Sequence, residues 1–246
     1  IRDYGIDRTR MRQAIAEFYF MASMTGRYTS SPETRFEADL GQVRDLASGE
    51  VFVAKLREIC DTTLTNDYWE ITLPSQLATS AARSPTLFAY QASLIMLDAP
   101  ALFSPLKLAA MVDPAIKGSK ASLEQHHLFP RAYLEAQGVT DLKLINQIAN
   151  FAPVEWPDNI KIGKQPPAEY VPAIDSQMTA AERERVYGLH ALPHLWWELP
   201  YDQFLVERRL RMAQVVRRAW ERLRGDAAIE AVSPPSVGRA SCRERV

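Results

Sequence analysis

The chain has 246 residues, of which 47% are hydrophobic and 24% charged, so it can fold around a sizeable core. Its formal net charge of −1 excludes a global basic field, and any DNA contact has to come from local patches. Cys60 and Cys242 fit neither a metal-ligand spacing nor a disulfide framework, which favours a reducing cytoplasm. The most apolar run, residues 87–103, is broken by Asp98 and Pro100, so we expect no membrane partner.

Helices are expected over residues 8–28, 30–48, 49–60 and 84–98, and again over 179–190 and 200–225. Gly26 predicts the end of the first helix, and the pair Ser31–Pro32 predicts the start of the second. Two apolar stripes are expected to face the core, Met11, Ile15, Phe18 and Ala22 in the first helix and Phe36, Leu40, Val43 and Leu46 in the second. Residues 84–98 are apolar nearly all round and predict a central helix.

The middle of the chain, residues 118–172, is interrupted by prolines and glycines and predicts short elements. Two short strands are expected over 122–129 and 148–156, with a short helix over 131–138 between them. The fold class expected is mainly α with a small embedded α+β module. Residues 1–117 would form a helical scaffold, 118–172 the module, and 173–225 a C-terminal helical region that packs on the scaffold.

Both ends of the chain look non-native. It starts at Ile1 without a methionine, as a fragment would, and residues 226–246 carry no apolar periodicity after Gly225. We therefore expect residues 226–246 to be a disordered or non-native tail.

A constellation of two histidines and two asparagines lies in the module: His126, His127, Asn150 and Asn159. Imidazole acts as a general base near neutral pH and is a common metal ligand. The asparagine side-chain oxygen is a hard, neutral ligand that suits Mg²⁺ or Mn²⁺. One histidine that binds a metal beside another that takes a proton from water would form a coherent hydrolytic site.

The stretches "EQHHLFP" (124–130) and "NQIANFAPVEWPDNIKIGKQPPAEY" (146–170) resemble the ββα-metal, or His–Me finger, motif of HNH endonucleases. The resemblance implies that His126 is a metal ligand and His127 the general base. It also implies that Asn150 stiffens the loop that aims the base, and that Asn159 is the second metal ligand. The helical scaffold would then carry a ββα-metal module.

A wider resemblance covers most of residues 8–225. "RYTSSPETRFEADL", "LFAYQASLIMLDAPALFS", "HHLFP" and "QFLVERRL" resemble, in this order, the C-terminal half of GmrSD-like bacterial proteins with a ParB-like N-terminal domain and a C-terminal HNH domain. This implies a DNA endonuclease, the effector half of a restriction or phage-defence protein, acting in the cytoplasm without its ParB-like half. Duplex cutting by such a single-site nuclease usually needs two active sites, so a homodimer is a further expectation.

The expected cofactor is a divalent metal ion, with Mg²⁺ or Mn²⁺ first and Ni²⁺ or Zn²⁺ as alternatives. Many HNH sites place an aspartate before the base histidine, whereas this chain has His126. Imidazole is softer than carboxylate and favours Mn²⁺, Ni²⁺ or Zn²⁺ over Mg²⁺. Arg131, Lys161 and Lys164 are candidates for holding DNA phosphates.

Alternatives stay open at this point. The chain could be a non-catalytic DNA-binding or interaction module that keeps the ββα shape, or a helical scaffold whose histidines merely pack. Asn146 is expected to be a cap or turn residue, and Glu124 a solvated strand carboxylate.

Other features favour structure. His190, His194 and the pair Trp196–Trp197 are expected to pack rather than bind. The arginines of the last helix fit equally a DNA-facing surface or a face paired with acids elsewhere.

Overall fold

A computed structural model describes residues 5–111 and 123–225. The expected tail, Cys242 and the beginning of the expected module lie outside these ranges. The described chain is mainly helical with one small antiparallel sheet, which confirms the expected fold class at this level. Its elements run α1 (Arg8–Met24), α2 (Pro32–Val43), α3 (Gly49–Thr63), η1 (Tyr68–Thr72), α4 (Leu73–Gln76), α5 (Pro85–Met96), α6 (Leu108–Met111), β1 (Leu123–His127), α7 (Arg131–Ala136), α8 (Leu142–Ile145), η2 (Ile148–Asn150), β2 (Phe151–Glu155), α9 (Trp156–Ile162), α10 (Pro167–Asp175), α11 (Ala180–Leu189), η3 (Trp196–Glu198) and α12 (Tyr201–Gly225).

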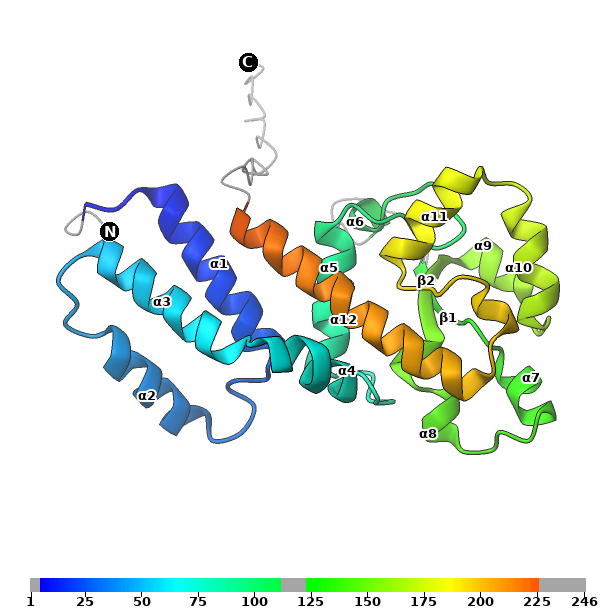
Figure 1. Cartoon of the computed structure of the whole chain (residues 1–246), viewed down its shortest axis with the longest axis horizontal. Helices are drawn as coiled ribbons and strands as arrows, with labels where there is room; N and C mark the ends of the chain where they lie inside the picture. The colour runs from blue at the N-terminus through cyan, green and yellow to red at the C-terminus, as the bar shows by residue number, and fades with distance from the viewer. Residues whose placement is uncertain (1–4, 112–122, 226–246) are drawn as a thin grey trace, which may run out of the picture.

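The first three helices form one end of the molecule (Figure 1). The Asp7 carboxylate caps α1 by accepting from the backbone N–H of Thr9 and Arg10. Helix α1 ends where expected, because Gly26 adopts a φ of +62° that ordinary residues avoid. Ser31 occupies the N-cap position of α2, yet its side chain makes no capping bond.

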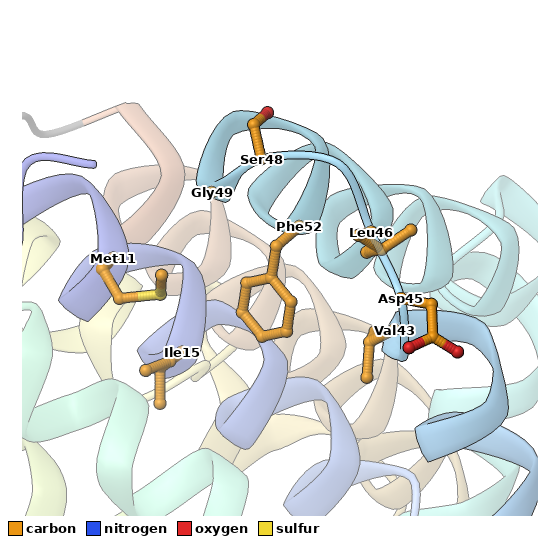
Figure 2. A pocket seen from close by; sticks show the side chains of 8 residues that line it. All are labelled: Met11, Ile15, Val43, Asp45, Leu46, Ser48, Gly49 and Phe52. Carbon is orange, nitrogen blue, oxygen red and sulfur yellow. The ribbon is translucent and has the colours of Figure 1, made fainter. Parts of the chain in front are cut away.

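The expected stripes are wrong in part. Ile15 is 51% exposed, because α1 turns Ala14, Glu17 and Met21 inward instead, and Leu40 on α2 is 62% exposed. A pocket of about 330 Å³ opens beside these helices (Figure 2). Its lining is Met11, Ile15, Val43, Asp45, Leu46, Ser48, Gly49 and Phe52. The stripe residues Met11 and Val43 therefore border this surface pocket, and they also pack against a small separate cluster of buried residues, Ile6, Ala14, Val53 and Leu56.

Helices α5 and α12 form the middle of the molecule. Helix α12 crosses it obliquely, from the N-terminal helices to the two-stranded sheet (Figure 1). The main hydrophobic core draws on all three expected regions, from Phe20 through Leu128 to Leu223. Helix α5 has a buried face with Tyr90 and Leu94, but Phe88 is 52% exposed, so it is not buried all round.

Strands β1 and β2 pair antiparallel, with His126 opposite Ala152 and His127 opposite Phe151. Helices α7 and α8 lie between the strands in the chain, and α9 follows β2 directly. A parallel bridge from Leu102 to Val154 attaches the sheet to the segment after α5. The sheet is thereby held against the helical core.

Candidate active site

The two histidines occupy the end of β1, next to the loop that leads into α7 (Figure 1). Strand geometry sends neighbouring side chains to opposite faces, and the exposure of the pair differs accordingly. His126 is buried, at 3% exposure, whereas His127 is partly exposed. Both nevertheless line the same open pocket of about 340 Å³, at the end of the strand. Its lining is Gln125, His126, His127, Pro130, Arg131, Ala132, Glu135, Asn159, Gly163 and Lys164.

Asn159 on α9 meets His126 on β1. The Asn159 Oδ1 lies 2.6 Å from the His126 Nδ1. The Asn159 Nδ2 donates to the carboxylate of Glu124, two residues earlier on the strand. Glu124 was expected to be a solvated carboxylate, and this is wrong, because it orients the Asn159 amide so that the oxygen faces His126. The i, i+2 spacing of Glu124 and His126, which puts both on one face of a strand, is the signal that could have predicted it.

His127 has a different partner. Its Nε2 lies 3.0 Å from the Oδ1 of Asn146, the residue that ends α8. Its ring also packs on Phe151, with the ring centroids 4.2 Å apart. Asn146 occupies a cap position as expected, but its side chain also holds the second histidine. Nothing in the sequence pattern distinguishes this role from an ordinary turn.

Asn150 ties the segment after β1 to the start of β2. Its Oδ1 accepts from the Phe129 N–H at 2.9 Å. Its Nδ2 donates to the carbonyls of Phe129 at 3.1 Å and Ile145 at 3.0 Å. The side chain is fully buried, and both its amide oxygen and its amide nitrogen are hydrogen-bonded. Asn150 therefore does not touch the pocket, and it acts on the site by fixing the backbone that follows His127.

The side chains of His126 and Asn159 are of types that bind divalent cations. The 2.6 Å between the His126 Nδ1 and the Asn159 Oδ1 is a hydrogen-bond distance, whereas two ligands of one ion with bonds of about 2.1 Å lie roughly 3 Å apart, so an ion would replace this bond. In the described part of the chain, no group of three or more His, Cys, Asp or Glu side chains could hold a metal. An ion at this place would thus keep most of its coordination positions for water and phosphate oxygens.

Burial sets the protonation of both histidines. It lowers the pKa of His126 below 6.5, with the charge of His127 adding to this and the Asn159 bond opposing it. It lowers the pKa of His127 too, and Arg131 adds to this while the Asn146 bond opposes it. Both rings are therefore neutral at pH 7, which is the form that binds metal or accepts a proton.

The three cationic candidates divide between two surfaces. Arg131 and Lys164 line the histidine pocket. Arg131 is also paired with Glu135 on α7, at 2.7 Å. Lys161 instead lines a neighbouring hollow with Phe103 and Tyr170, and its Nζ lies 3.4 Å from Asp158. The structure thus brings together two of the three, because Lys161 projects from another side of α9.

His190 and Trp196 pack as expected, whereas His194 does not. His190 is fully buried and its Nε2 donates to the Pro100 carbonyl at 2.8 Å, while His194 is exposed. Trp196 is buried in an aromatic cluster with Phe129 and Phe204, with both ring centroids 5.7 Å away.

The arginines of α12 mostly have partners within the molecule. Arg224 pairs with Asp61, Arg222 with Asp98 and Arg217 with Glu221. The pairs with Asp61 and Asp98 agree with the second expectation for this helix, a face paired with acids elsewhere, whereas Glu221 lies on α12 itself.

Comparisons of the chain with protein-family models, with curated proteins and with solved structures give no match. Within the described residues, no helix combines the length and the apolar character that a membrane crossing requires.

Proposed function

We propose that this chain is a metal-dependent endonuclease of the HNH, ββα-metal type that hydrolyses phosphodiester bonds in DNA. The observation that carries the proposal is the facing pair His126 Nδ1 and Asn159 Oδ1, with His127 on the same pocket. Two antiparallel strands and a following helix supply these groups in the order that the resemblance implies.

The proposed roles follow from the contacts of each side chain. His126 and Asn159 would hold the ion, and Glu124 would orient Asn159. A bound divalent cation supplies Lewis-acid stabilisation of charge on the phosphate and on the leaving oxygen. His127, neutral at pH 7 and held by Asn146, would accept the proton of the attacking water. Asn150 would keep the backbone after His127 in place.

Arg131 and Lys164 are proposed to contact the phosphates on either side of the reacting one, because both border the histidine pocket. Lys161 is a weaker candidate from its position. DNA as the substrate, a ParB-like N-terminal partner domain, a role in restriction or phage defence, a homodimer and a cytoplasmic location rest on the sequence resemblance alone. An imidazole ligand favours Mn²⁺, Ni²⁺ or Zn²⁺ relative to Mg²⁺, so Mn²⁺ is the first ion to test.

The test is nicking of supercoiled plasmid by the purified chain with each of Mg²⁺, Mn²⁺, Ni²⁺ and Zn²⁺. We expect cleavage with Mn²⁺, and we expect His127→Ala to slow it by about 10²–10⁴-fold while Mn²⁺ binding persists. His194→Ala is the matched control, since it removes an exposed histidine outside the pocket. Plasmid that shifts on a gel but stays intact with every ion would support the non-catalytic binding module instead.

A further inference from the structure

Arg208, in the first half of α12, is fully buried, and its partners are neutral. Its Nη1 donates to the Ala149 carbonyl at 2.6 Å, and its Nη2 donates to the His190 carbonyl at 3.3 Å. Its guanidinium carbon lies 5.9 Å from the centroid of the Phe204 ring. The Nε has no hydrogen-bond partner, and the groups that act on the guanidinium within the described residues are tyrosine hydroxyls, those of Tyr90, Tyr170 and Tyr201.

Such burial is costly. A cation that leaves water without a compensating anion loses more hydration energy than two carbonyl bonds return. Apolar side chains of similar volume often replace buried charges without loss of stability. Core stability is thus a poor explanation for an arginine buried at this position. A better explanation is that Arg208 holds the two carbonyls that it binds in place.

The stronger of its two bonds leads to the candidate site. Ala149 precedes Asn150 in the turn η2, and the Asn150 side chain binds both backbone groups of Phe129. The Asn150 carbonyl accepts from the N–H of Leu128, the residue after His127, at 2.8 Å. Arg208 therefore holds one end of a short chain of bonds, all buried, whose other end is the backbone beside His127.

We propose that Arg208 is a positioning residue of the candidate site: it fixes the Ala149–Asn150 turn on α12 and, through Asn150, the backbone that aims His127. Its effect on cleavage rests on the proposed nuclease function, whereas its effect on the turn does not. Because α12 extends from this turn to the N-terminal helices, the same guanidinium anchors the small sheet to the rest of the molecule (Figure 1).

The experiment compares Arg208→Met, Arg208→Lys and Arg218→Met in the full chain. Arg218 is the matched control, because it also donates from α12 to a backbone carbonyl, that of Gly188 at 2.9 Å, but on the exposed surface. Amide hydrogen exchange followed by NMR reports the Phe129 N–H, and plasmid nicking with Mn²⁺ reports kcat and KM.

For Arg208→Met we expect Phe129 and Leu128 to lose at least about tenfold in protection relative to the amides of α5 and α12. We expect kcat to fall about 10–100-fold with KM for DNA and Mn²⁺ affinity unchanged, since only the aim of the base changes. Arg208→Lys should retain part of the amide protection and part of kcat. Arg218→Met should retain the wild-type value of each. If Arg208→Met does not fold, the lysine variant decides on the same readouts.

Equal loss of protection throughout the core would overturn the proposal and make Arg208 a general stabiliser. Unchanged kcat in an active protein would overturn it as well. If the wild-type chain cleaves no DNA, the nuclease proposal fails, and the exchange of Phe129 still decides whether Arg208 fixes the turn.

Discussion

The side-chain oxygen of Asn159 faces the Nδ1 of His126 at 2.6 Å, although one residue lies on α9 and the other on β1. The contact exists because β2 pairs with β1 and α9 begins at the next residue, so the helix starts beside the strand. Glu124 accepts from the other end of the amide and prevents it from turning over. The two atoms proposed to bind the ion are thereby held together by a hydrogen bond, which an ion would replace.

We expect Mn²⁺ to bind this pair. His126→Ala and Asn159→Ala should each abolish the rise in melting temperature that Mn²⁺ causes in the wild-type chain, because each removes a ligand. Isothermal titration and thermal unfolding with and without Mn²⁺ provide the measurement. His194→Ala should behave as wild type, and equal Mn²⁺ affinity in all these variants would contradict the assigned ligands.

Glu124 is expected to affect ion binding indirectly, through the Asn159 amide. Glu124→Ala should weaken Mn²⁺ binding by about 10–100-fold, because the Asn159 amide would no longer be oriented. Glu135→Ala is a suitable control, since this carboxylate also borders the pocket but binds Arg131. A loss of affinity in both variants would indicate general electrostatics instead of an oriented amide.

Asn146 is expected to matter for turnover. Asn146→Ala removes the 3.0 Å contact to His127 Nε2 and leaves the packing on Phe151 to hold the ring. We expect kcat for plasmid nicking to fall about 10²-fold with unchanged Mn²⁺ affinity, since misplacement of a reacting group is costly. Asn66→Ala, which removes an exposed amide, should leave the rate unchanged. Normal turnover in Asn146→Ala would show that the base needs no such support.

His190 makes stability depend on pH. Burial is the main cause that lowers the pKa of His190 to about 4, and the nearby charge of Arg208 adds to it. The bond to the Pro100 carbonyl acts in the opposite direction. Above pH 6.5 the ring is neutral in both the folded and the unfolded chain. As pH falls below 6.5 the unfolded chain takes up the proton first, so the free energy of unfolding decreases until about pH 4, by roughly 3 kcal/mol at most.

Urea unfolding at pH 7 and pH 4.5 measures this effect. His190→Gln keeps a donor for the Pro100 carbonyl but cannot titrate, so its stability should change less between the two pH values than that of the wild type. His194→Gln should follow the wild type. An identical pH dependence in wild type and His190→Gln would refute the assignment.

Glu17 is expected to be a major stabilising residue of the helical end. Its carboxylate is fully buried and accepts two bonds from Arg57, at 3.0 and 2.9 Å. Glu17→Ala should cost about 1.5–3 kcal/mol, because it removes two hydrogen bonds to a charged group, while the 34% exposed Arg57 side chain can be solvated. Asp61→Ala breaks the pair of Arg224 with a carboxylate that is 55% exposed, and should cost less than about 1 kcal/mol. Thermal unfolding of both variants measures the two losses of stability. Similar losses would contradict the larger role expected for Glu17.

The sequence alone predicted the helical class, the ends of several helices and the short strands around the histidines. These depend on local signals: Asp, Ser, Pro and Gly at helix ends, apolar periodicity, and Pro and Gly interruptions. It also singled out His126, His127, Asn150 and Asn159, through residue type and order. Of these, His126 and Asn159 meet directly, and Asn150 holds the backbone beside His127.

The tertiary structure decided what local signals do not contain. Which face of α1 is buried depends on where α3 and α12 lie, and Ile15 is therefore exposed although its spacing predicts a core position. Glu124, Asn146 and Arg208 make their contacts with partners that other elements supply, namely Asn159, His127 and Ala149. A polar side chain looks the same in the sequence whether it faces water or a buried partner, and only the packing of distant segments distinguishes the two.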